Sequence, residues 1–316
     1  MLRLFFYDIE ITGMEEIKSW QEDIRSGWAR HPFWAYSRHH SSYERDLYVI
    51  TSNKEDWTVC ASIRELGNSA EYLITYFDRK SGKLLQKRLQ RHHIKSHRDL
   101  PESSDSQQDT NFSCNEMRLS FIRKEELRSI LVSSPELEYF DARFSLIQPD
   151  ELESLCTMTT WKDNRTSFYF DRKLNCMRTS GTMRLGDSTF HITEEDEVFA
   201  SLNIIRGRLP HKDCGRWLTL CFSEGGHTIG LDIVPNGEST IVYDNRLQRI
   251  DTVTESDENR HFCSSDGRLD LRFTITPGQM ESNSLQFGYC TGKVVLDDKT
   301  EVAVKNIPAS MEIRRD

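Results

Sequence analysis

The segment that most constrains the fold of this chain lies near its C-terminal end, where residues 285–306 read LQFGYCTGKVVLDDKTEVAVKN. Two runs of alternating apolar residues flank the pair Asp297-Asp298, a pattern typical of a β-hairpin. Because neighbouring side chains of a strand point to opposite faces, each run offers one apolar face to a core. The segment therefore predicts two antiparallel strands joined by a turn.

The same alternation recurs along most of the chain, and turn-forming pairs such as Ser81-Gly82 and Asn236-Gly237 separate the runs. Many short strands joined by turns are typical of antiparallel sandwiches and barrels, so we expect an all-β protein. The further strands are expected over residues 47–51, 58–63, 71–77, 116–122, 138–147, 166–170, 188–192, 198–205, 217–222, 227–234 and 239–247.

Helical periodicity is scarce. Residues 14–25 (MEEIKSWQEDIR) place Ile17, Trp20 and Ile24 three and four positions apart, which predicts a short amphipathic helix near the N-terminus. A second short helix is expected over residues 124–132.

The alternation is interrupted over residues 147–164, where Pro149 and several acidic residues occur. A chain of 316 residues is long enough for two domains. We therefore expect two β domains, each a barrel or sandwich, covering residues 1–155 and 156–316.

Charge and hydropathy exclude several classes of protein. A net charge of −9 argues against general nucleic-acid binding. The one basic run, residues 83–98, is either a solvated strand and loop or a local binding patch. No apolar run reaches the roughly 18 residues of a transmembrane helix, and the first residues lack the pattern of a secretory signal, so we expect a cytoplasmic location.

Metal and cofactor signatures are scarce as well. No two of the eight cysteines are three residues apart, which favours reduced thiols over a zinc or redox motif. The histidines at 39, 40, 92, 93 and 97 lack matching cysteine or carboxylate spacing. The motifs of nucleotide binding, dinucleotide binding and serine hydrolysis are missing. We expect neither a metal ion nor an organic cofactor.

Several segments resemble those of a large family of two-domain β proteins that is classed as a domain of unknown function. The C-terminal hairpin resembles the family's signature, with its Phe-Gly-Tyr strand and Val-Leu-Asp-Asp turn. Residues 27–32 (GWARHP), 168–181 (FYFDRKLNCMRTSG) and 201–210 (SLNIIRGRLP) are similar to three further family segments. The resemblance implies a pair of lipocalin-like barrels, similar to the fold of carotenoid hydratases and of fungal Diels–Alder cyclases.

The chain also departs from the family pattern. Asn203 stands where the family usually has an acid, and Ile204 and Leu209 stand where it has tryptophan. A long glycine-rich loop of the family is reduced here to residues 235–239, which include Glu238. These differences imply a reshaped pocket.

Arg206 is the first candidate for chemistry, because it ends a strand that is expected to be buried. A buried arginine must be paired or must bind a ligand. Asp232, on another apolar strand, is the expected partner for an ion pair, and ligand binding is the equal alternative. Lys173 and Asn175 share one face if their segment is extended, although a lysine there also suits a solvated strand end.

Tyr169 and Trp217 either form the floor of a pocket or pack in a core. We thus expect Arg206, Asp232 and Lys173 to be catalytic. The expected substrate-binding residues are Tyr169, Asn175, Asn203, Trp217 and Glu238.

The leading hypothesis is a cofactor-independent cyclase or isomerase, of a Diels–Alderase or hydratase type. It would bind an apolar polyene or terpenoid-like small molecule in a pocket within or between the barrels, as part of a biosynthetic route. Holding a reactive conformer and polarising a carbonyl would supply the catalysis. The alternatives are a non-catalytic carrier or sensor of a lipid-like molecule, and a scaffold that uses its sheet edges for protein contacts.

Overall fold

The computed structural model describes residues 10, 15–17, 27–32, 34–36, 42–92, 99–101, 108–161, 164–208, 215–256, 260–279 and 284–313. Within these ranges the protein is all-β, as expected, and the helical segment described is a single 3-10 turn, η1 (Glu194–Asp196). None of the described residues form a helix of the length and apolar character that crossing a bilayer requires.

The first sheet has thirteen strands and follows the order β7-β6-β5-β4-β15-β13-β11-β10-β9-β8, with β12 and β14 attached to β13 and β2 attached to β12. The sheet curls so that its two ends meet: Tyr72 of β6 stacks on Phe112 of β8, with ring centroids 3.6 Å apart. The strands are β2 (Gly27–Ala29), β4 (Tyr43–Ser52), β5 (Trp57–Leu66), β6 (Ser69–Asp78), β7 (Lys83–His92), β8 (Thr110–Ser113), β9 (Arg118–Lys124), β10 (Leu127–Ser134), β11 (Phe140–Ile147), β12 (Leu155–Trp161), β13 (Asn164–Leu185), β14 (Ser188–Ile192) and β15 (Val198–Arg208).

The second sheet has nine antiparallel strands in the order β19-β18-β17-β16-β24-β23-β22-β21-β20. They are β16 (Arg216–Glu224), β17 (His227–Ile233), β18 (Ser239–Tyr243), β19 (Arg246–Ile250), β20 (Val253–Ser256), β21 (His261–Ser264), β22 (Leu269–Ile275), β23 (Leu285–Val295) and β24 (Glu301–Ile313). The pair β23–β24 is the predicted C-terminal hairpin, closed by a hydrogen bond from the amide of Leu296 to the carbonyl of Thr300 at 2.9 Å.

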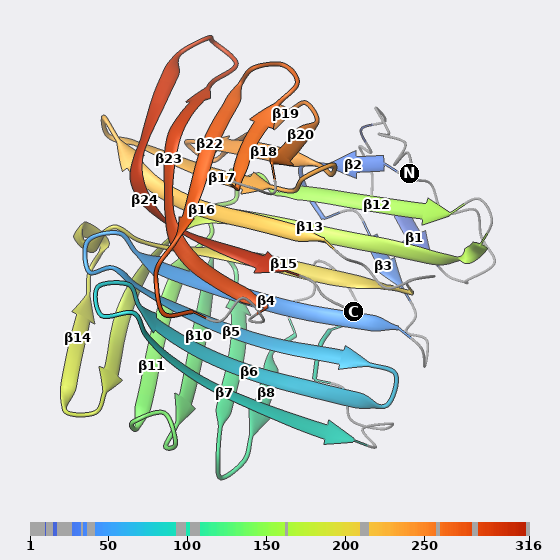
Figure 1. The fold of residues 1–316 in the computed structure, drawn as a ribbon. Coiled ribbons are helices and arrows are strands. Elements are labelled where there is room, and N and C mark those ends of the chain that lie inside the picture. The colour runs from blue at the N-terminus through green and yellow to red at the C-terminus, as the bar shows by residue number, and fades with distance from the viewer. Residues whose placement is uncertain are drawn as a thin grey trace.

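The second sheet packs on the face of the first sheet that β4, β13 and β15 form, with the orange and red strands above them in Figure 1. A buried apolar cluster lies between the sheets and contains Leu47 and Val49 of β4, Trp217 of β16 and Phe287 of β23. Phe287 stacks on Phe77 of β6 with ring centroids 4.8 Å apart. The fold is therefore a pair of lipocalin-like β units packed face to face.

Both predicted helices are wrong where the structure describes them. Residues 15–17 form strand β1 (Glu15–Ile17), which pairs in parallel with β3 (Trp34–Tyr36); the rest of the predicted helix 14–25 lies outside the described residues. Residues 124–132 form the end of β9, the turn after it and most of β10. Arg128, Ile130 and Val132 alternate into the core, so period-two burial and pairing outweigh helix propensity.

The run 239–247 is a hairpin rather than one strand. Asp244 and Asn245 have φ values of 45° and 71° and form the two-residue turn between β18 and β19. The first sheet takes in strands on both sides of residue 155, so hydrogen bonding does not divide the chain there. The division into units 1–155 and 156–316 stays a prediction.

The basic run 83–98 supplies edge strand β7 as far as residue 92, and its residues 93–98 lie outside the described part of the chain. Lys87 is paired with Glu116 and Glu136 at 2.5 and 2.6 Å, and Lys83 with Glu138 at 2.7 Å. Carboxylates of the same protein therefore neutralise part of this strand.

Candidate functional site

Most of the predicted site residues lie on, or pack against, the two faces of the first sheet. Strand β15 lies between β13 and β4, and Asn203 is in register with Lys173 on one side and Leu47 on the other. These three residues belong to the face that meets the second sheet. Arg206, three residues after Asn203, belongs to the opposite face. The predicted residues therefore do not form a single site.

On the inner face of the first sheet lies a cavity of about 30 Å³, which has room for one or two water-sized groups. Its wall includes Asp46 and Tyr48 of β4, Arg128 of β10, and Ile204 and Arg206 of β15. Asp46 and Tyr48 are two residues apart on one strand, so both side chains point to the same face.

Arg206 holds the carboxylate of Asp46. Its side chain is 1% exposed, and its Nη1 donates to Asp46 Oδ1 at 2.7 Å and to the carbonyl of Arg45 at 3.1 Å. Its Nε donates to the carbonyl of Pro101 at 3.2 Å. The predicted ion pair between Arg206 and Asp232 is wrong, because the two residues lie on different faces and Asp46 takes the partner's place.

The second oxygen of Asp46, Oδ2, accepts no hydrogen bond from the residues that the structure describes. The carboxylate is therefore oriented through one oxygen and keeps the lone pairs of the other for a further donor. A carboxylate in this state can accept a proton from a bound molecule.

Tyr48 is held by Arg128. The hydroxyl of Tyr48 accepts a hydrogen bond from Arg128 Nη1 at 3.2 Å, and Arg128 Nε donates to Gln148 Oε1 at 2.6 Å. Burial raises the pKa of Tyr48, against the opposing effect of Arg128. Within the described residues, the hydroxyl proton of Tyr48 has no acceptor. Tyr48 can therefore donate a hydrogen bond to a group in the cavity.

The opposite face carries a buried polar network that joins the two sheets. Arg45 of β4 forms an ion pair with Glu312 of β24 and also donates to the amide oxygen of Asn203. Asn203 donates to Asp171, which is ion-paired with Lys173. Lys173 is thus buried and paired, not a solvated strand end. All charges along this chain of contacts are matched.

Asp232 and Trp217 lie beside this network. The indole Nε1 of Trp217 donates to Asp232 Oδ1 at 2.9 Å, so Trp217 packs between the sheets and satisfies a carboxylate. Burial raises the pKa of Asp232 to about 6, against the opposing effects of Lys173 and the Trp217 hydrogen bond.

Asn175 cross-links β13 to the second sheet. Its Nδ2 donates to Thr219 Oγ1 and to the carbonyl of Leu220, each at 3.2 Å, and to the carbonyl of Leu231 at 3.3 Å. Its Oδ1 accepts from the hydroxyl of Ser201 at 2.8 Å. With its hydrogen bonds directed at protein groups, Asn175 holds the sheets together.

Two predicted residues lie apart from both groups. Tyr169 is half-buried near the start of β13, in register with Gly207, and does not line the cavity. Glu238 lies in the turn before β18 and accepts from Arg249 Nη2 at 2.8 Å. The structure therefore brings Lys173, Asn203 and Asp232 together and separates them from Arg206, Tyr169 and Glu238.

Asp46, Tyr48 and Arg128 were missed from the sequence. The segment ERDLYVIT (residues 44–51) begins with three adjacent charges, Glu44, Arg45 and Asp46, within a buried strand. Such adjacent charges indicate that both faces of a strand meet polar partners, and this signal could have identified Asp46. Nothing in the sequence pairs Arg128 with Tyr48, since 80 residues separate them.

Comparison with solved structures shows the fold. An AttH-like protein from Nitrosomonas europaea shares it with a TM-score of 0.52 at 8% identity, over 86% of this chain and 93% of that one. Kievitone hydratase from Nectria haematococca gives a TM-score of 0.49 at 10% identity, covering 86% and 89%. CghA in complex with Sch210972 gives 0.43 at 8% identity, covering 87% and 89%.

No curated protein matches the sequence. A family model does match it, over residues 21–316, and so covers nearly the whole chain. The expected relationship is thereby confirmed, and the chain belongs to the family described as a domain of unknown function, DUF2804.

Proposed function

We propose that the protein is a cofactor-independent enzyme of the hydratase, isomerase or cyclase type, which transfers protons to and from a small molecule. The observation that carries this proposal is the pairing of Asp46 and Tyr48 on one wall of a small cavity. Among the described residues, Asp46 keeps one carboxylate oxygen without a hydrogen bond and Tyr48 a hydroxyl proton without an acceptor, and an arginine holds each side chain.

These residues divide the work as base and acid. Asp46 Oδ2 accepts a proton from a water molecule or from an acidic carbon of the ligand, and Arg206 keeps the carboxylate in position. Tyr48 donates its hydrogen bond to the ligand oxygen on which negative charge develops, and Arg128 stabilises the phenolic oxygen as its proton moves. Arg206 stays in the proposed site, whereas Asp46 and Tyr48 replace Asp232 and Lys173 as its other two members.

The size of the cavity limits what enters it. A volume of about 30 Å³ accommodates a water molecule or the carbonyl or hydroxyl end of a ligand. A ligand with an apolar body and one polar end would place only that end between Asp46 and Tyr48. The proposed ligand is therefore an apolar small molecule with one oxygen function, such as a polyene or terpenoid-like ketone or alcohol.

Untargeted mass spectrometry tests the proposal, because it detects the conversion of any compound in a mixture. The full chain is incubated with a small-molecule extract of the source cells in ¹⁸O-labelled water. We expect one compound to be converted into a product that gains or loses a water, or that has equal mass and a different retention time. Asp46→Asn and Tyr48→Phe should each slow the conversion about 100-fold or more.

Asp232→Asn is the matched control, because it neutralises a buried carboxylate of β17, away from the cavity, and should leave the rate unchanged. If the wild type and both cavity variants retain a compound equally and convert nothing, the protein is a carrier. A rate that falls with Asp232→Asn but not with Asp46→Asn would refute the assignment of the site.

A further inference from the structure

A second group of chemically competent side chains lies on strands β21 and β22, near the edge of the second sheet. His261 and Cys263 are two residues apart on β21, and the intervening Phe262 is fully buried in the core. Because side chains alternate along a strand, His261 and Cys263 share the face opposite Phe262. Asp270 of β22 is in register with Cys263 and joins them on that face.

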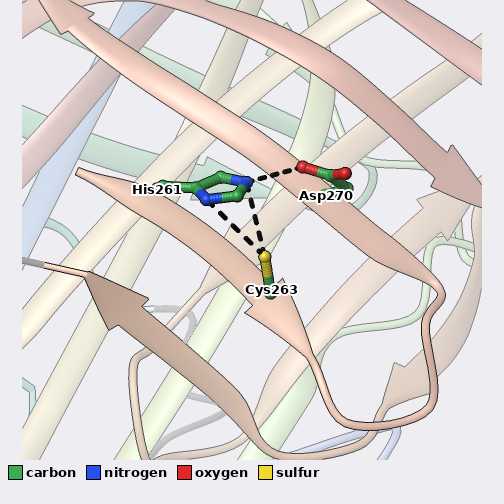
Figure 2. Close-up of side chains that lie close together, drawn as sticks. All are labelled: His261, Cys263 and Asp270. Atoms are coloured by element: carbon green, nitrogen blue, oxygen red, sulfur yellow. Dashed lines mark hydrogen bonds and ion pairs between the residues drawn. The ribbon is translucent and has the colours of Figure 1, made fainter. Parts of the chain in front are cut away.

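The three donor atoms converge, as Figure 2 shows. His261 Nε2 lies 2.6 Å from Asp270 Oδ1, and Cys263 Sγ lies 3.4 Å from His261 Nε2. All three donors lie within 4.8 Å of one another, and the described residues contain no other such group of His, Cys, Asp and Glu side chains. In a tetrahedral zinc site with bonds of about 2.0–2.3 Å, the ligand atoms are roughly 3.3–3.8 Å apart.

We propose that His261, Cys263 and Asp270 form a binding site for a zinc-like divalent cation. A thiolate, an imidazole and a carboxylate are the three side-chain donor types of protein zinc sites. Three ligands from the chain leave a fourth position for water. The arrangement escapes a search for sequence spacing, because the third ligand comes from the neighbouring strand.

The surroundings permit a cation to reach these side chains. The side chains of His261 and Asp270 are 34% and 57% exposed. Lys293 of β23 lies opposite Asp270, but its ammonium group is paired with Glu301 at 2.7 Å. The carboxylate of Asp270 is therefore available to a cation. Burial and the charge of Asp270 raise the pKa of the Cys263 thiol, so a bound cation must displace a proton from sulfur.

Titration with the metal alone tests the site. Tag-free full-length protein is titrated with Zn²⁺ by calorimetry and with Co²⁺ by absorption spectroscopy. We expect one high-affinity ion per chain and a thiolate-to-cobalt charge-transfer band. Cys263→Ser should abolish that band, and Cys263→Ser, His261→Ala and Asp270→Asn should each weaken zinc binding at least about tenfold. Binding should also weaken as pH falls, because the cation must displace a proton from the sulfur of Cys263.

The chain provides two matched controls. His227 and Asp244 form a similar exposed pair, with His227 Nδ1 2.5 Å from Asp244 Oδ2, and this pair includes no cysteine. Cys114 is another half-buried free thiol. His227→Ala and Cys114→Ser should leave zinc affinity unchanged. Less than one ion per chain, or affinity that survives both His261→Ala and Cys263→Ser, would overturn the proposal and leave the group as a hydrogen-bonded surface cluster.

Discussion

Arg206 and Asp232 illustrate how the two faces of the first sheet separate the roles of single residues. Arg206 lies on the cavity side with Asp46, whereas Asp232 faces the first sheet from β17 and is bonded to Trp217. Each buried charge has its own partner, so changing one residue should affect one face only. This separation makes stability measurements on single and double variants informative.

Arg206→Met should cost about 3–5 kcal/mol of unfolding free energy, because it leaves the carboxylate of Asp46 buried without its cation. Adding Asp46→Asn should restore part of that loss, whereas adding Asp232→Asn should not. Urea denaturation of the two double variants measures the difference. Equal rescue by Asp232→Asn would show that the pairing with Asp46 is wrong.

Asp232 should make the free energy of unfolding decrease as pH rises, which is unusual for a carboxylate. Its folded pKa of about 6 lies above the ordinary 3.8, so the folded state holds this proton more tightly than the unfolded state. The resulting stabilisation is complete below about pH 4 and is lost as pH rises through 6. The shift corresponds to about 3 kcal/mol.

Asp232→Asn removes this titration. We expect the variant to match the wild type near pH 4 and to exceed it in stability at pH 7, in denaturant unfolding at both pH values. Parallel pH profiles for the two proteins would contradict the raised pKa.

At the scale of elements, the close packing of β13 on β17 depends on a glycine. A Cβ atom at Gly230 would lie 2.3 Å from Cys176 Sγ and 3.1 Å from the side-chain amide of Asn175. Asn175 is fixed by its hydrogen bonds to the second sheet, so it cannot move aside freely. The sheets therefore meet at this distance only because residue 230 lacks a side chain.

Gly230→Ala should destabilise the protein by about 2–3 kcal/mol, through overpacking between the sheets. Cys176→Ala in the same chain removes the nearest atom and should recover part of that loss. Gly225→Ala is the control, since its Cβ would meet nothing within 4 Å and its φ of 59° alone costs about 1 kcal/mol. Equal losses at the two glycines, measured by urea unfolding, would refute the overpacking.

At the scale of the whole molecule, an ion pair, hydrogen bonds and apolar packing, all buried, join the two sheets. Arg45 is paired with Glu312, and Arg79 at the end of β6 donates to the carbonyls of Gly288 and Ala309 in the second sheet. An apolar cluster including Leu47 and Phe287 fills the space between them. Exposing this surface by opening one sheet alone would leave charges unpaired and apolar area in water.

We therefore expect the protein to unfold in one cooperative transition. Differential scanning calorimetry should give a single peak whose calorimetric and van't Hoff enthalpies agree. Two resolved transitions would mean that each sheet is stable without the other.

The strand pattern was predictable because alternation is a local property. The hairpin over residues 285–306 and the all-β class follow from it directly. The turn at Asp244-Asn245 was missed because the apolar residues on its two sides suggest one strand, whereas both turn residues have positive φ values and reverse the chain. The site was divided wrongly because alternation shows which residues of one strand share a face, but not which distant strands meet that face. Asp46 and Arg128 become site residues only through pairing across the sheet.

Strand β4 has a consequence for how members of this family can diverge. Every residue from Glu44 to Val49 is buried, and alternate side chains serve the cavity and the contact between the sheets. The residues next to Asp46 and Tyr48 on this strand, Leu47 and Val49, pack between the sheets. A substitution that shifts the strand to reshape the cavity wall would therefore also disturb this packing. Substitutions that preserve both functions of β4 are therefore few. New ligand preferences are more accessible by changing the opposite wall of the cavity, on β10, where alternate residues are not fully buried.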